Sequence, residues 1–472
     1  MRKKTKIVAT ISDKNCEPDF IKKLYDEGMD VVRLNTAHMD FDSAEKVIKN
    51  IRQVSEKIAI LIDTKGPEIR TVAMPEPKKV EEGDILLVKG EPNGNCADNY
   101  ICLSYPGIFT DVPVGSQILL DDGDLEMIVL DKKEECLVCE VKNAGWIKGR
   151  KSVNIPSVQI NLPAITQKDI GFINFAAQHN VDFIAHSFVR KAADIIAVQS
   201  ILDSVGSHIK IIAKIENKEG VDNIDSILDY AYGVMVARGD LALEISPEKL
   251  PMVQKDLVAK CNERRKPVIV ATQMLHTMIE NPRPTRAEVN DIANAILEGT
   301  DALMLSGETA YGKYPLESVK MMNAIALEVE KSLPAFVEMP KRVLSSEVGW
   351  FLVYAAVNAS KDLPIKAIVA DTTSGTTVRA LAAYRCHIPI KAQCYSMETV
   401  RMLALSYGVY AHYMQPKERH HEFAKEALQK LLDLGGYKKD DLVLLIAGSF
   451  GRKSGTTFIE IGEIDNLMHN HD

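Results

Sequence analysis

Eight short runs of apolar and β-branched residues recur along the first two thirds of the chain, and each is followed by a helix-like stretch. The runs are nearly continuous in apolar residues, which is typical of strands buried on both faces of a parallel sheet. They cover residues 5–11, 29–35, 58–64, 181–188, 209–216, 233–240, 266–273 and 301–308. Eight such units predict an α/β protein built on a (β/α)8 TIM barrel, with an open stack of strands and helices as the alternative.

More than one hundred residues separate the third run from the fourth, too many for one connection. This segment contains alternating strands broken by Gly, Pro and Asp, which predicts a small inserted β-barrel domain. At the catalytic face of a barrel such an insertion acts as a lid.

After about residue 345 the strand–helix pattern restarts, which predicts a C-terminal α/β domain. We expect strands at 366–371, 390–396 and 441–448, helices at 376–385 and 397–408, and an antiparallel edge strand at 456–464. The predicted segments are 1–70 (barrel, first part), 71–154 (lid), 155–343 (barrel, second part) and 344–472 (C-terminal, regulatory-type domain).

Composition narrows the class of protein. With 57 Lys and Arg against 65 Asp and Glu, the net charge is −8, so no global basic field attracts nucleic acid or an anionic membrane. No apolar run approaches the roughly 18 residues of a membrane span, and the N-terminal run is too short for a signal peptide. Cys136 and Cys139 form a CxxC with no second pair, which favours reduced thiols in a cytoplasmic protein over a zinc site.

Polar residues end most of the apolar runs, where a barrel carries its active site. Lys214 and Glu216 point to the same side of one strand end and form either a plain ion pair or part of a site. Glu216 and Asp240, at the end of the next strand, are suited to share one Mg²⁺. Gly239 either turns the chain or presents its backbone N–H to an anion.

Other strand ends carry weaker signals. Thr272 is either a simple β-former or a hydroxyl that passes a proton. Arg33 and Arg70 are candidates for bidentate phosphate contacts, although such arginines are often only solvated charges. Oxygens suitable for a hard monovalent cation are supplied by Asn35, Asp63 and Thr64.

Ten longer motifs run through the chain, and together they are more specific than any single residue. They are TKIVATI, RLN.AH, DTKGPEIR, KGRKSVNIP, LPAITQKD, IAKIEN.EG, MVARGDL, KPVIVATQML, PRPTRAEV.D.ANA and D..MLSGETA.G.YP. In content and order they resemble the pyruvate kinase family over essentially the whole chain. The resemblance implies the same three-part layout, transfer of a phosphoryl group from phosphoenolpyruvate to ADP to give ATP and pyruvate, and a homotetramer.

The resemblance also implies roles for individual residues. It gives catalytic roles to Lys214, Thr272 and Arg33, and substrate contacts to these three with Gly239 and Asp240. It implies Mg²⁺ or Mn²⁺ on Glu216 and Asp240, with a second ion arriving with the nucleotide, and K⁺ on Asn35, Asp63 and Thr64. Nucleotide contacts are implied for Arg70, Lys151, His38 and Asn35.

In this family the C-terminal domain binds sugar-phosphate effectors. The residues that resemble its phosphate loop are Thr372, Thr373, Ser374, Gly375, Thr376 and Thr377, with Gly455 and Thr456 of GRKSGTTF as the closing loop. Such a loop binds phosphate through N–H groups at a helix start, or is an ordinary capped turn. Thr376 stands where some fructose-bisphosphate-regulated relatives carry Lys, so the expected effector is a monophosphate, or there is none.

The sequence departs from the family pattern at several positions. Ala37 replaces a serine that supplies a K⁺ ligand, a loss worth about 1 kcal/mol of cation binding. Glu68, in contrast, matches the K⁺-dependent form, so we expect weak K⁺ stimulation. Ser12 and Asp13 replace a Gly–Pro pair near the nucleotide base, which leaves the nucleotide preference open.

Two other functions are alternatives to the kinase function that the resemblance implies. A barrel lyase that binds phosphoenolpyruvate or pyruvate with Mg²⁺ would explain Glu216 and Asp240, but not the lid or Lys151. A catalytically weakened relative that acts as a metabolite sensor would be expected to lack Lys214, a metal carboxylate or Thr272, and all of these are present.

Overall fold

The eight predicted runs each contain a strand of one closed parallel barrel. The computed structural model describes residues 2–94, 100–334, 336–338, 347–417, 419–448 and 455–469. The barrel strands are β1 Lys6–Thr10, β2 Val31–Asn35, β3 Ala59–Asp63, β13 Phe183–His186, β14 Lys210–Ile215, β15 Gly233–Ala237, β16 Val268–Ala271 and β17 Ala302–Leu305. Their order is β1-β17-β16-β15-β14-β13-β3-β2, and β1 pairs with both β17 and β2. The barrel prediction is therefore confirmed, and the open stack is wrong.

Alternate residues of each barrel strand face opposite sides. On β1, Val8 packs inside the barrel with Val31 and Phe183, whereas Ile7 and Ala9 belong to the layer between strands and helices. The surrounding helices are α1 Pro18–Asp26, α2 Phe41–Val54, α4 Gln167–Gln178, α5 Ala192–Ser204, α6 Lys218–Asp222, α7 Ile224–Tyr230, α8 Arg238–Glu244, α9 Leu250–Glu263, α10 Arg286–Leu297, α11 Gly307–Ala310 and α12 Pro315–Val329, with 3₁₀ turns η1 Pro247–Lys249 and η2 His276–Ile279. Both faces of the strands are thus buried, as the continuous apolar runs require.

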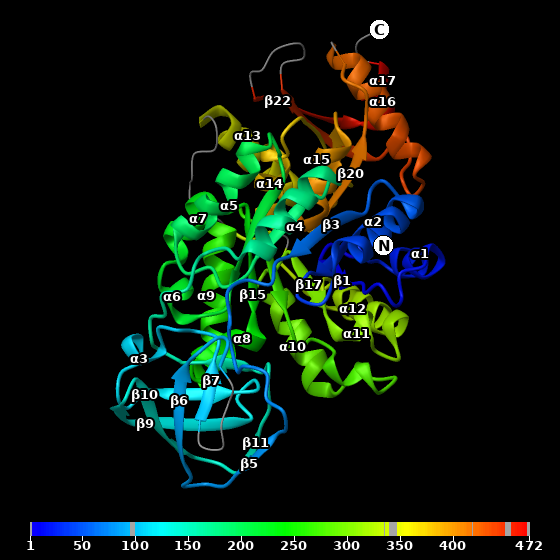
Figure 1. Cartoon of the computed structure of the whole chain (residues 1–472). Helices are drawn as coiled ribbons and strands as arrows, with labels where there is room; N and C mark the ends of the chain where they lie inside the picture. The colour runs from blue at the N-terminus through cyan, green and yellow to red at the C-terminus, as the bar shows by residue number, and fades with distance from the viewer. Residues whose placement is uncertain are drawn as a thin grey trace.

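The inserted segment forms a separate, largely antiparallel domain with its own core (Figure 1). Its elements are β4 Ile69–Arg70, β5 Lys78–Val80, β6 Ile85–Gly90, β7 Tyr100–Leu103, α3 Ile108–Asp111, β8 Gln117–Leu120, β9 Leu125–Lys133, β10 Cys136–Val141, β11 Gly145–Ile147 and β12 Ser152–Asn154. A seven-stranded sheet has the order β4-β12-β8-β9-β10-β6-β7, and β11 pairs with β5. Cys136 and Cys139 are buried free thiols on β10. Among the described residues no three His, Cys, Asp or Glu side chains gather as a metal site.

The C-terminal domain is a five-stranded sheet of order β20-β19-β18-β21-β22 covered by helices on both faces. Its elements are α13 Glu347–Asp362, β18 Ile368–Thr372, α14 Thr376–Ala383, β19 Ile390–Cys394, α15 Met397–Met402, η3 Leu403–Leu405, β20 Val409–Tyr413, α16 His420–Asp433, β21 Leu442–Gly448, β22 Thr456–Glu463 and α17 Ile464–His469. The edge strand β22 is antiparallel to β21, as predicted.

One helix prediction in this domain is wrong in extent. The helix expected over 397–408 ends at Met402 and continues only as the short turn η3. Gly408 has a φ of +67°, a left-handed conformation that favours glycine and breaks the helical course. The next residues, Val409–Tyr413, include Val409, Tyr410 and Tyr413, which are residue types favoured in strands, and they add to the sheet beside β19.

The lid and the C-terminal domain lie at opposite ends of the barrel (Figure 1). At the C-terminal domain's end, Arg385 donates to both carboxylate oxygens of Asp301, at 2.7 and 2.9 Å, just before β17. Arg401 makes a second such contact, 2.6 Å from Asp182. All four side chains are at most 8% exposed, so buried ion pairs tie the C-terminal domain to the barrel.

Candidate functional site

Four charged side chains meet at the C-terminal ends of three barrel strands. Arg33 of β2 places its Nε 2.6 Å from Oδ2 of Asp63, the last residue of β3. Lys214 of β14 places its Nζ 2.9 Å from Oδ1 of Asp63 and 3.0 Å from Oε1 of Glu216. Each of the four is at most 9% exposed. The structure thus brings together Arg33, Asp63, Lys214 and Glu216 as one buried network of alternating charge.

This network favours the ionised forms of Lys214 and Asp63. Burial alone would lower the pKa of Lys214, but the carboxylates of Asp63 and Glu216 outweigh burial and raise that pKa above its usual value. Burial would likewise raise the pKa of Asp63, and the neighbouring Arg33 and Lys214 instead hold it below its usual value. Lys214 is therefore a permanent cation at neutral pH, suited to an anionic ligand.

Glu216 and Asp240 form the second feature of the site. Asp240 lies in the first turn of α8, directly after β15. Burial, and then repulsion from Glu216, raise the pKa of Asp240 to about 7. Two carboxylates that repel each other in this way fit one divalent cation, which would remove the repulsion. Mg²⁺ characteristically takes one or two protein carboxylates and leaves its other positions to water or substrate.

Thr272 follows β16 in a left-handed conformation, with a φ of +69°. Its hydroxyl accepts a hydrogen bond from the backbone N–H of Gly239 at 2.8 Å, and its carbonyl accepts one from Arg238 at 2.6 Å. Such a conformation is uncommon for a β-branched residue and is held here by its neighbours. Thr272 and Gly239 therefore lie side by side, and Gly239 directly precedes Asp240 in the chain.

The proposed monovalent-cation ligands also come together. Asn35 and Asp63 are paired residues at the ends of β2 and β3, and Thr64 follows directly. The side-chain oxygen of Asn35 accepts a hydrogen bond from the N–H of Ala37 at 3.2 Å. The donor set is made of carboxylate, amide and hydroxyl or carbonyl oxygens, which suits a hard cation.

The predicted nucleotide residues are more dispersed. Arg70 on β4 forms a fork with both carboxylate oxygens of Glu68, at 2.9 Å each. Lys151 of the lid lies 2.8 Å from Asp121 of the same domain. His38 is exposed and joins the site only through its backbone N–H, which donates to the Asn35 carbonyl at 3.3 Å. Arg70 and Lys151 therefore pair with nearby carboxylates, Glu68 and Asp121, rather than with members of the network around Lys214.

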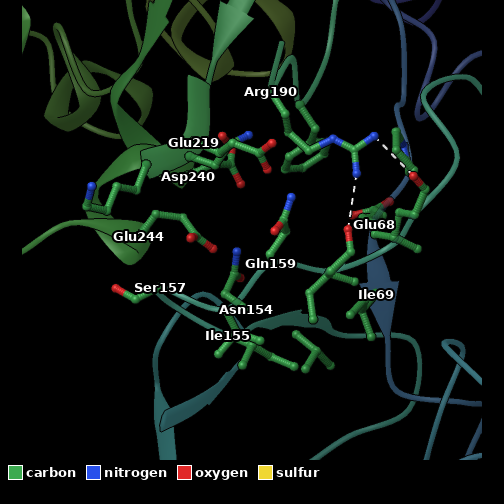
Figure 2. A pocket seen from close by; sticks show the side chains of 18 of the residues that line it. Glu68, Ile69, Asn154, Ile155, Ser157, Gln159, Arg190, Glu219, Asp240 and Glu244 are labelled. Carbon is green, nitrogen blue, oxygen red and sulfur yellow. Dashed lines mark hydrogen bonds between the residues drawn. The ribbon is translucent and has the colours of Figure 1, made fainter. Parts of the chain in front are cut away.

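A cleft of about 550 Å³ lies between the barrel and the lid. Figure 2 shows Asp240 and Glu244 of α8 on one side, with Asn154 of β12 and Gln159 nearby. Asp240 is the predicted metal ligand that lines this cleft, and Phe188 and Glu68 line it as well. The carboxylate of Asp240 is therefore open to a ligand in the cleft, whereas Lys214 and Arg33 are buried and are not among the residues that line it.

The predicted effector loop is an ordered turn before α14. The hydroxyl of Thr372 accepts the N–H of Gly375 at 2.7 Å, and Gly375 has a φ of +75°. The hydroxyl oxygens of Thr377 and Thr456 are 2.5 Å apart, which joins this turn to the start of β22. Residues 451–454 of the predicted closing loop lie outside the described part of the chain.

Several residues around the site were not predicted from the sequence. Ser187 and Phe188, directly after β13, contact Lys214 and Glu216. Glu308 accepts the N–H groups of Leu275 and Ser306, at 3.1 and 2.7 Å, and so braces the loop after Thr272. A serine, a phenylalanine or a lone glutamate after an apolar run carries no distinguishing signal, because the partners are distant in sequence.

Comparison with known proteins gives one consistent result. Residues 2–319 match the family description "Pyruvate kinase, barrel domain", and residues 351–461 match "Pyruvate kinase, alpha/beta domain". The pyruvate kinase of Borreliella burgdorferi is 48% identical over 99% of this chain and 98% of its own length. That of Bacillus licheniformis is 43% identical over 99% of this chain and 81% of its own length.

A solved structure agrees with this result. The crystal structure of a pyruvate kinase from Cryptosporidium parvum superposes with a TM-score of 0.91 at 35% identity, covering 98% of this chain and 96% of that one. The barrel, the lid and the C-terminal sheet described above are thus shared with that protein over nearly full length. The chain belongs to the pyruvate kinase family of phosphotransferases, whose members in general depend on a divalent metal and a monovalent cation.

Proposed function

We propose that this chain transfers the phosphoryl group of phosphoenolpyruvate to ADP, giving ATP and pyruvate, the last step of glycolysis. The observation that carries the proposal is the buried network of Arg33, Asp63, Lys214 and Glu216 beside Asp240. Both substrates are polyanions, and two like unit charges about 4 Å apart repel by roughly 1 kcal/mol even in water. A site for this reaction must therefore supply fixed positive charge.

In this proposal Arg33 and Lys214 bind the phosphoryl group, and Lys214 stabilises the negative charge that develops during transfer. The loose transition state needs alignment and charge neutralisation more than covalent chemistry. Gly239 and Asp240 contact the substrate carboxylate, and the hydroxyl of Thr272 takes part, through water, in protonating the methylene carbon of the enolate. Thr272 is suited to this role because Gly239 holds its hydroxyl at a fixed position.

Metal ligands are part of the same proposal. Glu216 and Asp240 would hold Mg²⁺ or Mn²⁺, and Asn35, Asp63 and Thr64 would hold K⁺. When bound, these cations supply further charge neutralisation for the substrate oxygens.

We assign nucleotide contacts to Arg70, Lys151, His38 and Asn35. Because Arg70 is bound to Glu68 and Lys151 to Asp121, binding of a nucleotide phosphate requires each cation to exchange or share its carboxylate partner. Both side chains are more than one third exposed, so the exchange costs little.

The decisive experiment is to measure pyruvate formation from phosphoenolpyruvate and ADP with Mg²⁺, once in K⁺ and once in Na⁺. We expect turnover that is faster in K⁺ by a modest factor, because Ala37 offers no hydroxyl to the cation. Equal rates in both salts would contradict the K⁺ site. No turnover in either salt, with the protein folded and sugar phosphates present, would instead favour the metabolite-sensor function.

The variant Glu216→Gln tests the metal assignment. It preserves the shape of the side chain and removes one charge, so we expect the Mg²⁺ concentration for half-maximal activity to rise at least about tenfold. Titration of activity with Mg²⁺ measures this shift. The variant Glu219→Gln is a matched control, because Glu219 lies three residues further along, in α6, and lines the cleft, whereas the carboxylates that pair with Lys214 are those of Asp63 and Glu216. An unchanged Mg²⁺ dependence of Glu216→Gln would refute the assignment.

We further propose that the turn Thr372, Thr373, Ser374, Gly375, Thr376 and Thr377 binds the phosphate of a sugar-monophosphate effector, and that the enzyme is a cytoplasmic homotetramer. The effector proposal is supported by the left-handed Gly375 at the start of α14, where free N–H groups favour an anion.

No helix in the described residues has the length and apolar character needed to cross a membrane.

A further inference from the structure

Ser187 contacts the proposed catalytic lysine, Lys214. It follows β13 and is 1% exposed. Its hydroxyl oxygen accepts a hydrogen bond from Nζ of Lys214 at 2.6 Å, the shortest of the contacts made by that ammonium group. Ser187 is therefore a direct partner of Lys214.

The ammonium group of Lys214 has three N–H donors, and the structure gives it three acceptors. These are the hydroxyl of Ser187 and the carboxylates of Asp63 and Glu216, at 2.6, 2.9 and 3.0 Å. A phosphoryl oxygen that binds Lys214 must take over or share one of these N–H groups. The ammonium group would then keep two of its three acceptors, and the positions of those two fix the direction of the third N–H.

Glu216 is the acceptor that the proposed function also assigns, together with the cleft-lining Asp240, to a divalent cation. Asp63 and Ser187 are the other two acceptors, and each is 1% exposed. If a divalent cation held Glu216, Asp63 and Ser187 would remain as the two acceptors that orient the ammonium group, and its third N–H would be available to a phosphoryl oxygen.

The hydroxyl proton of Ser187 is itself fixed. Its nearer acceptor is the backbone carbonyl of Thr64 at 2.6 Å, and Oδ1 of Asp63 lies further away at 3.3 Å, while the N–H of Ser187 donates to the hydroxyl of Thr64 at 3.1 Å. With its proton committed in this way, the serine oxygen presents a lone pair to Lys214. Ser187 thus links the end of β3 to the lysine on β14.

The backbone of Phe188, the residue after Ser187, is also held in place. It adopts a φ of +55°, uncommon for a non-glycine residue, and its N–H donates to Oε2 of Glu216 at 2.7 Å. A Cβ added to Gly66 would lie 2.7 Å from Cβ of Ser187 and 2.8 Å from the ring of Phe188, so only glycine fits there. Strain of this kind persists where neighbouring packing enforces it, frequently at functional sites.

We propose that Ser187 is a positioning residue for the phosphoryl transfer: its hydroxyl holds the ammonium group of Lys214 in the direction required by the transferring phosphoryl group. The inference rests on the reaction proposed above. Since Ser187 acts through Lys214, its loss should reduce turnover without weakening the binding of phosphoenolpyruvate.

The test compares Ser187→Ala with the parent enzyme. We expect kcat to fall about 10–100-fold, the effect of losing one hydrogen bond to a charged group, while KM and the directly measured Kd for phosphoenolpyruvate change less than about threefold. Ser187→Cys, which keeps the side-chain connectivity but replaces the hydroxyl with a larger thiol that accepts hydrogen bonds poorly, should show the same split.

Ser318→Ala is the matched control. Ser318 is also fully buried and donates its hydroxyl to a backbone carbonyl, that of Tyr314 at 2.8 Å, but it lies on α12 away from the site. We expect this control to keep the parent kcat. The melting temperatures of all three variants, measured without substrate, identify any loss that comes from unfolding rather than from a misplaced lysine.

A double variant separates positioning from direct substrate contact. Adding Ser187→Ala to Lys214→Met should reduce kcat less than about twofold further, because the group being positioned is already absent. A further tenfold loss would overturn the proposal, as would a parent-like kcat in Ser187→Ala or a loss confined to Kd. If the parent enzyme itself makes no pyruvate, the reaction proposal fails instead, and the inference falls with it.

Discussion

The variant Lys214→Met is expected to lower kcat by at least about 10²–10³ while the protein stays folded and still binds phosphoenolpyruvate. Methionine keeps an unbranched apolar side chain that is one heavy atom shorter and removes the charge. The lost charge is the one that would meet the transferring phosphoryl group, so the effect should appear in the chemical step. Steady-state turnover at saturating substrate, together with a binding titration, measures the two parts separately.

The same substitution at Lys210 provides the control. Lys210 begins β14, and Lys214 lies four residues further along the same strand, at the end that carries the site. Lys210→Met should therefore retain nearly the parent kcat. Near-parent turnover in Lys214→Met would refute the catalytic role of this lysine, and equal losses in both variants would indicate damage to the strand rather than to the reaction.

The second large effect is expected in stability. Arg385→Met should lower the free energy of unfolding by about 3–5 kcal/mol, because it leaves the buried carboxylate of Asp301 without its cation. The guanidinium also donates to the Asn262 side chain at 2.5 Å and to the Gly299 carbonyl at 2.6 Å. Chemical denaturation followed by far-UV circular dichroism would report the loss.

An exposed ion pair gives the comparison. Lys22 and Asp26 are 2.9 Å apart on α1 with side chains 62% and 56% exposed, so Lys22→Met should cost no more than about 1 kcal/mol. A loss below about 1 kcal/mol in Arg385→Met would contradict the view that the Asp301 contact secures the C-terminal domain to the barrel.

The barrel was predictable because its information is local. Each strand is a short, continuous apolar run, and the polar residue at its end identifies the catalytic end of the barrel. Lys214 and Glu216 are two residues apart, so the strand period alone places them on one side. Asn35 and Asp63 end neighbouring strands in register, which placed the proposed cation ligands together.

What the sequence did not reveal depends on contacts between distant segments. Ser187 meets Thr64 across more than one hundred residues, and a buried serine with this role looks like any other. The sequence suggested that Arg70 and Lys151 were available for phosphate, but each forms an ion pair, with Glu68 and Asp121 respectively. Strand β20 was not predicted: the expected helix ended at Gly408, and only the pairing with β19 shows that Val409–Tyr413 is a strand.

The position of the lid within the chain dictates an order of assembly. Pairing of β3 with β13 joins Leu61 to Phe183, and pairing of β1 with β17 joins Lys6 to Ala302. A ribosome must therefore release residues of β17 before the barrel can close, whereas every strand of the lid has emerged once β12 is complete. The lid sheet can therefore form while the barrel is unfinished, and the exposed apolar strands β1, β2 and β3 need protection from aggregation during that interval.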